Sequence, residues 1–405
     1  MRPFTSFEEE SIQFLVRRGI EFATIHITQT GFKKSTLDAT IPVRSYFKKR
    51  NFVDYDNLAR GRENGMDVKT LILTPYEKPF ETTTSIYKPK AKQDKGGDPR
   101  LWIIKCQKYI SPNDIFILIE LDKSLYVIDI SKVNIQEAYN SVLNNYIREF
   151  IDGITMEDDD DEIAIELYNR IKEELKGWKK VIMTNKADTA IGRSVEHYLG
   201  INMNSNKEPD YKGIELKTHR IASHNRVTLF SQAPFSFPKY GSSKKFVEKY
   251  GYPGRRTGKL TFCQDIRGDR PNKRNFKLDL NYKEKRLEAN YCSSKPDDNG
   301  NYRILDRIAL WQLDHLHNRL LEKHNKTFWI EADRRDNNGI EEFQCKKIIF
   351  SKRPLVSQFD TLIENGTIIT SWAVERDDNG GDYYNFRIFP RDLSLLIPEN
   401  EPLYL

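Results

Sequence analysis

The sequence lacks the features that mark membrane, secreted and zinc-binding proteins. No apolar run approaches the roughly 18 residues of a membrane-spanning helix, and the opening stretch MRPFTSFEEES has no apolar signal region. The cysteines Cys106, Cys263, Cys292 and Cys345 stand singly, without a C-x-x-C pair. This pattern argues against a zinc site and against a disulfide framework. The absences predict a soluble, cytoplasmic protein with no membrane partner.

The chain also lacks a strong excess of either charge. Lys and Arg number 65 against 59 Asp and Glu, which gives a formal net charge of +6. So mild a balance permits an acidic partner such as nucleic acid without requiring one. With 405 residues, of which 38% are hydrophobic, the chain can bury sizeable cores, and two domains are expected.

A run of acids divides the sequence. Residues 151–162 end in EDDDDE, and like charges in a row repel one another, so we interpret this stretch as a solvated linker. The alternative, an acidic metal cluster, is less favoured because consecutive acids without turn residues rarely converge on one ion. Residues 1–150 would then form one domain and residues 163–405 another. A helix is predicted at 163–178, where apolar residues recur every four positions.

The segment before the linker is predicted to be rich in strands. Residues 114–130 resemble two buried strands joined by a turn at Asp122–Ser124. Residues 101–110 are either a strand or a short buried helix, since periodicity does not decide. A basic loop with Gly and Pro breakers spans 86–100. Its lysines could contact phosphates or simply keep the loop solvated.

The second segment alternates between helical and strand patterns. This order predicts a mixed sheet flanked by helices, of the α/β (α+β) class. The predicted elements are a helix at 189–201, strands at 211–219 and 225–234, a hairpin of 275–282 and 286–292, a long amphipathic helix at 304–324 and a strand at 326–335.

The stretch EPDYKGIELKTHR at residues 208–220 could form a metal site. Strand side chains alternate between faces, so Glu215 and Lys217 project from the same face. A bend at Lys212–Gly213 would bring Asp210 back beside Glu215. Paired carboxylates hold Mg²⁺, the Leu216 carbonyl could add an oxygen ligand, and a lysine can orient the attacking water of phosphodiester hydrolysis.

Spacing alone does not separate this site from an exposed charged hairpin. The pattern D-x4-E-x-K is short, and Asp279, Glu284 and Arg286 nearly repeat it, although arginine cannot replace a lysine beside a metal-bound water. The context favours a site. Glu196 lies on the predicted helix just upstream of the strand, where it is a candidate fourth acid.

The run DTAIGRSVEHYLGINMNSNKEPDYKGIELKTHR resembles the core motif of MutH-like PD-(D/E)XK nucleases, and within them the MvaI/BcnI group of restriction endonucleases. Further matches follow in VTLFSQAP, NFKLDLNYKEKRL and YYNFRIFPRDLSLL, so the resemblance covers about residue 165 to the end. The matching positions of the core motif are Thr189, Ile191, Gly192, Glu196, Pro209, Asp210, Tyr211, Glu215, Lys217, Thr218 and His219.

The resemblance implies the roles of several residues. Asp210 and Glu215 would bind Mg²⁺, with Mn²⁺ expected to substitute, while Lys217 would serve the water and Glu196 would support the site. Arg387 lies where the group has an arginine that reads a base edge. The chain departs from the group in having NGGDYY where a compared member has histidines, and in its own loop KYGSSKKFVEKYGYPGRRTGK. These departures leave the target sequence open.

Basic residues gather between residues 239 and 274, with tyrosines interleaved. Such a cationic, Gly-containing stretch can approach phosphates closely, although a solubilising surface loop would look the same. The candidate DNA contacts here are Arg255, Arg256, Arg270, Lys273 and Arg274. The N-terminal segment faintly resembles the B3-like barrels fused to some restriction enzymes, which would make Lys88 and Arg100 DNA contacts too. A protein-interaction or scaffolding role is the alternative.

The leading hypothesis is a Mg²⁺-dependent, sequence-specific endonuclease that cleaves double-stranded DNA and works beside a cognate DNA methyltransferase. A strand-nicking enzyme of the MutH type is the second hypothesis, slightly disfavoured by the long N-terminal extension. A DNA-binding protein with an inactive site is the third, and the complete set of Asp210, Glu215 and Lys217 argues against it. Cleavage of a defined plasmid would discriminate among the three.

Overall fold

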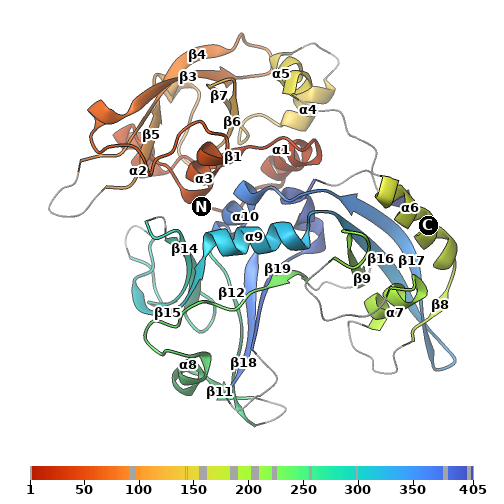
Figure 1. Cartoon of the computed structure of the whole chain (residues 1–405). Coiled ribbons are helices and arrows are strands. Elements are labelled where there is room, and N and C mark those ends of the chain that lie inside the picture. The colour runs from red at the N-terminus through yellow and green to blue at the C-terminus, as the bar shows by residue number, and fades with distance from the viewer. Residues whose placement is uncertain are drawn as a thin grey trace.

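The computed structural model shows a mixed α/β protein, drawn in Figure 1. It describes residues 2–90, 97–141, 143, 145–154, 162–182, 190–201, 209–220, 226–254, 258–281, 283–297, 300–376, 382–398 and 403–404. Within this part of the chain, no helix is long and apolar enough to cross a membrane. The predicted fold class is confirmed, since several sheets are flanked by helices.

The N-terminal part is built on a seven-stranded sheet with the order β1-β6-β7-β3-β4-β5-β2. The sheet forms a curled half-barrel, in agreement with the β-rich prediction. Its strands are β1 (Ala23–His26), β2 (Leu37–Asp38), β3 (Met66–Leu73), β4 (Phe80–Tyr87), β5 (Arg100–Ile103), β6 (Ile115–Leu121) and β7 (Ser124–Asp129). Its helices are α1 (Ser6–Arg17), α2 (Gln29–Lys34), α3 (Ile41–Lys49), α4 (Ile135–Asn140) and α5 (Tyr146–Ile154).

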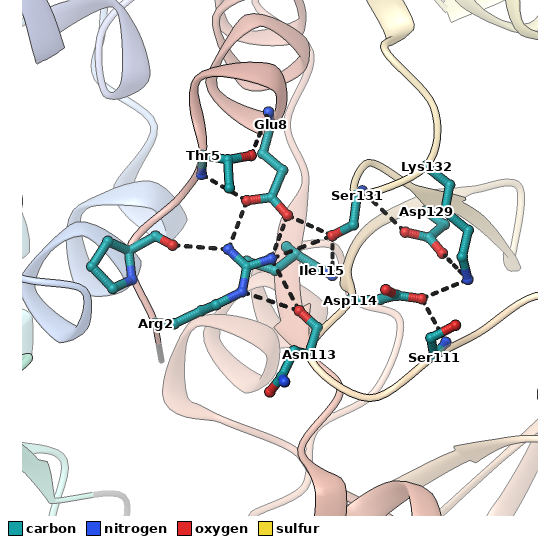
Figure 2. Close-up of polar contacts among 11 residues, drawn as sticks. Arg2, Thr5, Glu8, Ser111, Asn113, Asp114, Ile115, Asp129, Ser131 and Lys132 are labelled. Atoms are coloured by element: carbon teal, nitrogen blue, oxygen red, sulfur yellow. Dashed lines mark hydrogen bonds and ion pairs between the residues drawn. The ribbon is translucent and has the colours of Figure 1, made fainter.

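A polar network fixes the start of α1 against this sheet (Figure 2). Thr5 and Glu8 form a capping box, which satisfies amide groups that the first helical turn leaves free. The Arg2 guanidinium donates to both carboxylate oxygens of Glu8 and, at 3.1 and 3.0 Å, to the Asn113 carbonyl. Burial raises the pKa of Glu8, but the bonds from Arg2 and Ser131 outweigh it and hold that pKa below its usual value.

The second part of the chain contains three further sheets. The first, in the order β20-β17-β16-β9 with β8 paired to β17, consists of β8 (Lys179–Lys180), β9 (Glu215–Arg220), β16 (Thr327–Asn337), β17 (Ile340–Ser351) and β20 (Leu403–Tyr404). The second, in the order β10-β19-β18-β12-β11, consists of β10 (Val227–Ser231), β11 (Tyr252–Pro253), β12 (Leu260–Ile266), β18 (Ile369–Glu375) and β19 (Tyr383–Ile388). The third consists of β13 (Phe276–Asn281), β14 (Arg286–Cys292) and β15 (Ile304–Gln312).

Helices cover these sheets and join them to the N-terminal part. They are α6 (Glu162–Glu174), α7 (Ala190–Tyr198), α8 (Ser243–Tyr250), α9 (Leu313–Lys323) and α10 (Val356–Glu364), and a short 3₁₀ helix, η3, follows at Pro390–Leu395. Both α6 and α7 contribute to the core of the β9–β16–β17 sheet. In Figure 1, α3, α10 and α9 lie one below another in the centre of the molecule.

One apolar core is shared by both parts of the chain. It includes Phe14 and Leu15 of α1, Phe359 of α10 and Leu393 of η3. Polar bonds cross the same boundary: the Thr24 and Thr361 hydroxyls lie 3.2 Å apart, and the Ser357 hydroxyl donates to the Phe22 carbonyl at 2.7 Å. The N-terminal part is therefore packed onto the remainder of the chain.

The prediction of a helix over 304–324 is wrong in its first half. Residues 304–312 form β15, which pairs with β14, and only Leu313–Lys323 are helical. Apolar residues such as Ile304 and Ile308 happen to be spaced by four, but strand pairing overrides that local pattern. The alternatives for 101–110 are both partly realised, because β5 ends at Ile103 and a 3₁₀ turn follows at Cys106–Lys108.

Other predicted elements are confirmed. The two strands of 114–130 are β6 and β7, with Asp122 and Lys123 in the left-handed region at their turn. The hairpin of 275–292 is β13 and β14. Helix α5 reaches Ile154 and α6 begins at Glu162, so residues 155–161 of the predicted acidic linker lie outside the described residues.

Candidate active site

A tight turn brings the two ends of the PDYKGIELK segment together. The Tyr211 amide donates to the Ile214 carbonyl at 2.9 Å, and the Ile214 amide donates back at 2.7 Å. Lys212 and Gly213 between them have φ values of 43° and 89°, the left-handed pair of a two-residue hairpin turn. The predicted bend is confirmed, and glycine at its second position avoids strain in the left-handed region.

The turn feeds directly into β9, the edge strand of its sheet. This strand pairs in parallel with β16, so that Glu215 faces Thr327 and Lys217 faces Trp329 along the ladder. Ile214 and Leu216 are buried in the apolar core, as strand alternation predicts. Glu215 is also nearly buried, and its Oε1 accepts a hydrogen bond of 2.6 Å from Lys217 Nζ. The two side chains therefore share one face and are in contact.

Asp210 lies against the start of this strand. Its Oδ2 accepts a hydrogen bond of 2.8 Å from the Leu216 amide, which orients the carboxylate. Burial and then the charge of Glu215 raise the pKa of Asp210. A carboxylate whose ionisation is disfavoured by a neighbouring negative charge is stabilised by a cation bound beside it.

Glu196 approaches the same cluster from α7, which packs on β9. Burial, and next the charge of Asp210, raise the pKa of Glu196 above its usual value. The charges of Lys217 and Glu215 act on it as well. The structure therefore brings together all four residues that the sequence suggested for the site.

Lys323, at the end of α9, is a further cation that the sequence reasoning missed. Its Nζ lies 3.3 and 3.4 Å from the two carboxylate oxygens of Glu215. Glu215 thus receives two ammonium groups, one from its own strand and one from a helix 108 residues later in the chain. No local sequence pattern predicts such a contact, because it arises from the packing of α9 beside β9.

His324 fixes the position of Lys323. Its ring is fully buried and stacks on Trp329 with 5.4 Å between centroids. Its Nε2 donates to the Leu229 carbonyl at 2.8 Å, and the Thr327 hydroxyl lies 3.1 Å from Nδ1. Burial and the nearby Lys217 charge lower the pKa of His324 to about 4, so the ring is neutral at neutral pH. Through its bond to the Leu229 carbonyl, His324 joins the end of α9 to β10.

Strand β10 begins a sheet with one polar face. Asp265, Ser371, Asn385 and Ser231 lie opposite one another on β12, β18, β19 and β10. Their side chains are exposed or half-buried, while most of the neighbouring positions on the four strands are buried, namely Phe230, Ile266, Thr370, Trp372, Tyr384 and Phe386. Arg387 lies two residues beyond Asn385 on β19 and therefore shares this face. It donates to the Arg226 carbonyl at 2.6 Å, which holds its guanidinium in place.

The other predicted DNA contacts are scattered. Lys273 and Arg274 are exposed after β12, with Arg274 3.9 Å from the Tyr252 ring centroid, and Arg270 lies 3.9 Å from Asp269. Lys88 donates to the carbonyls of Asp56 and Leu58, so it holds a loop, and Arg100 lies 3.8 Å from Asp38. Arg255 and Arg256 lie outside the described residues. The contacts of Lys88 and Arg100 given above are all with N-terminal residues and not with the acidic cluster.

Helix α8 lies within the basic segment of residues 239–274 and is anchored to β15. Asp306 of β15 accepts hydrogen bonds from the hydroxyls of Tyr240 and, at 2.8 Å, of Tyr250. Burial raises the pKa of Asp306, but these bonds and nearby lysines outweigh it and bring that pKa to about 2. Tyr240 and Tyr250, two of the interleaved tyrosines, therefore anchor α8 to β15.

The donors at the acidic cluster suit a magnesium ion. Within the described residues there is no group of three or more His, Cys, Asp or Glu side chains arranged to hold a metal. Mg²⁺ nevertheless needs only one or two carboxylates, with waters filling its remaining positions. Asp210 and Glu215 provide hard oxygen donors of that kind, and their mutual repulsion favours a cation between them.

Comparison with known proteins identifies the second part of the chain. The solved structure described as "Restriction endonuclease MvaI-cognate DNA substrate complex" matches with a TM-score of 0.50 at 22% identity, over 61% of this chain and 99% of that chain. "Restriction endonuclease MvaI in the absence of DNA" matches with a TM-score of 0.38 at 21% identity, over 60% and 99%. No curated protein matches the chain. A family model matches residues 165–397, more than half of the chain, which therefore belongs to the MvaI/BcnI restriction endonuclease family and is a DNA endonuclease.

Proposed function

We propose that this protein is a Mg²⁺-dependent endonuclease that cleaves double-stranded DNA at a specific sequence. The observation that carries the proposal is the meeting of Asp210, Glu215 and Lys217 at the start of an edge strand. An edge strand leaves one side of the site open, so a DNA backbone can reach it. Because the DNA complex of MvaI shares the fold of residues 165–397, a duplex is the expected substrate.

Each residue of the acidic cluster would have its own role in hydrolysis. Asp210 and Glu215 would hold Mg²⁺, with Mn²⁺ as a substitute and the Leu216 carbonyl as a further oxygen donor. A bound ion of this kind polarises the phosphate and lowers the pKa of a coordinated water. Lys217 would orient the attacking water and stabilise charge that grows on the phosphoryl oxygens. Glu196 would accept a proton or a water-mediated contact beside Asp210.

Sequence recognition would use the polar face of the β10–β19–β18–β12 sheet. Arginine pairs well with guanine, and an Asn amide with adenine, in the major groove. We assign base contacts to Arg387 and to its neighbour Asn385. Arg270, Lys273, Arg274, Arg255 and Arg256 would contact phosphates, with Lys88 and Arg100 serving a second DNA surface on the N-terminal domain.

The biological setting is part of the same proposal. A sequence-specific endonuclease threatens the DNA of its own cell, so a cognate DNA methyltransferase is the expected partner and the cytoplasm the expected location. We place the domains at 1–150 and 163–405, with the N-terminal domain adding a recognition or effector surface. A strand-nicking enzyme would use the same site, and the number of strands cut distinguishes it.

Plasmid cleavage tests the site assignment. Asp210→Ala and Lys217→Ala are expected to abolish cleavage in Mg²⁺ while binding to the same DNA persists, because the base and phosphate contacts proposed above for the polar sheet face and the basic residues are left in place. Lys212→Ala is the matched control, since the Lys212 ammonium lies 2.7 Å from Glu166 and not in the cluster. Sequencing the cut ends would give the target and the number of strands cleaved. Unchanged cleavage by either site variant would refute the assignment.

A further inference from the structure

A cavity of about 560 Å³ lies between the N-terminal part and the remainder of the chain. Helix α3 and residues 54–56 form one wall, and α9, Arg353 and the first residue of α10 form the other. This size suits a ligand of nucleotide dimensions, and boundaries between packed parts of a chain are a frequent place for such sites. The cavity is separate from the acidic cluster, whose residues do not line it.

The walls carry more positive than negative charge. Five Lys or Arg residues and three Asp residues line the cavity, a difference of two. The cations are Arg44, Lys48, Lys49, Lys285 and Arg353, and the acids are Asp54, Asp56 and Asp314. Four of these charges offset one another: Lys48 lies 3.0 and 3.1 Å from Asp54 and Asp56, and Lys285 lies 2.6 Å from Asp56.

Arg353 is the cation best placed to meet a ligand. It is exposed at the cavity and forms no ion pair with any residue in the described ranges. Lys49, by contrast, is already paired with Glu21. A guanidinium without a carboxylate partner can form two parallel hydrogen bonds with a phosphate.

His317 of α9, on the same wall as Arg353, also lines the cavity. Its Nε2 lies 2.7 Å from Asp360, which is fully buried behind it, and among the described residues Nδ1 has no partner. Burial lowers the pKa of His317, but the charge of Asp360 and the bond to it outweigh that effect and raise the pKa above its usual value. When the ring is protonated, both of its nitrogens carry a proton, and Nδ1–H can be donated to an anion.

The remaining lining is mainly apolar, with Ser45 and Asn318 as its polar members. Ile41, Leu313, Leu321 and Val356 line the cavity together with Tyr55, whose hydroxyl donates to the Arg100 carbonyl. A ligand that fits must combine an anionic group with a flat or apolar body. We propose that this cavity binds a nucleoside monophosphate, with its phosphate at Arg353 and His317 and its base against the apolar wall. The proposal goes beyond DNA cleavage and does not depend on it.

Binding to the full-length chain in metal-free buffer tests the proposal. Calorimetry with a deoxynucleoside 5′-monophosphate is expected to show saturable binding that inorganic phosphate or the free nucleoside alone does not reproduce. Arg353→Glu should weaken this binding by about tenfold or more, because a charge-assisted hydrogen bond is replaced by repulsion. His317→Gln should weaken it as well. Arg391→Glu is the control, since that arginine is exposed on η3 and does not line the cavity.

Two further outcomes separate this site from the acidic cluster. Lys217→Ala should keep full nucleotide affinity even though it is expected to lose cleavage, and Arg353→Glu should keep cleavage. Loss of nucleotide binding in Lys217→Ala would place the ligand at the acidic cluster and overturn the proposal. Equal affinity in the wild type and Arg353→Glu, equally tight binding of inorganic phosphate, or no saturable binding at millimolar nucleotide would overturn it too.

Discussion

At the scale of single residues, the acidic cluster was largely predictable because its members are close in sequence. The strand period placed Glu215 beside Lys217, and Gly213 indicated the bend that returns Asp210. Lys323 was not predictable in this way, because its contact with Glu215 spans 108 residues and depends on how α9 packs. The bond between Arg387 and the Arg226 carbonyl spans 161 residues and escaped prediction for the same reason.

Replacing Lys323 tests whether it acts in cleavage. Lys323→Met is expected to slow cleavage by about a hundredfold, the usual scale for removing one electrostatic partner of a reacting phosphate. The same change should lower the Mg²⁺ concentration that gives half-maximal rate, because the ammonium no longer competes for Glu215. Lys323→Arg should recover part of the rate by restoring the charge.

A merely structural role for Lys323 would give a different pattern. In that case the rate and the thermal stability would fall together, with no change in magnesium dependence. His315→Gln on the exposed face of the same helix is the matched control and should leave both the rate and the magnesium dependence unchanged.

The raised pKa of Asp210 predicts a pH dependence with a definite sign. The carboxylate must be ionised to hold a metal, so cleavage is lost as pH falls through a pKa that burial and Glu215 have raised. Protons and Mg²⁺ compete for the same oxygens. The acidic limb of the rate profile should therefore move to lower pH as Mg²⁺ is increased.

Initial cleavage rates across the acidic range at two magnesium concentrations measure this shift. Glu166→Gln serves as a control, because Glu166 is exposed and bonds Lys212 outside the cluster, and it should leave the shift intact. If the acidic limb of the rate profile lay at the same pH at both magnesium concentrations, the assignment of Asp210 as a metal ligand would be contradicted.

At the scale of elements, local patterns predicted the strands well where alternation was clean. The strands β6, β7, β13 and β14 were all anticipated. The error at 304–312 has a physical cause: its apolar residues satisfy a helical period and a strand pairing equally, and the pairing with β14 decides. The hydrogen bonds that Asp306 of this strand accepts from tyrosines near both ends of α8 were likewise not predictable from local patterns.

At the scale of the whole molecule, the shared core predicts that both parts of the chain unfold together. Phe359 is fully buried in α10, with its ring near those of Phe230 and Phe386. Phe359→Ala should cost about 3–5 kcal/mol of unfolding free energy. Because α10 also packs against α3, hydrogen exchange should speed up in N-terminal strand β6 as well as in β18.

A substitution in the core around β9 and β16 serves as the control for Phe359→Ala. Leu167 of α6 is equally buried but belongs to the cluster around β9 and β16. Leu167→Ala should accelerate exchange around β9 and β16 more than in β6. Exchange in β6 that is unaffected by Phe359→Ala would show that the N-terminal part folds independently of α10.

The packing of α1 against η3 also sets the order of events during synthesis. Leu15 and Leu393 belong to one core, yet the ribosome makes them 378 residues apart. At a synthesis rate of about 5–20 residues per second, Leu393 is made on the order of 20–80 s after Leu15. Until then the apolar face of α1 cannot pack against η3. The nascent N-terminal part is exposed to chaperones and proteases throughout that interval, and the shared core is complete only after η3 has been synthesised.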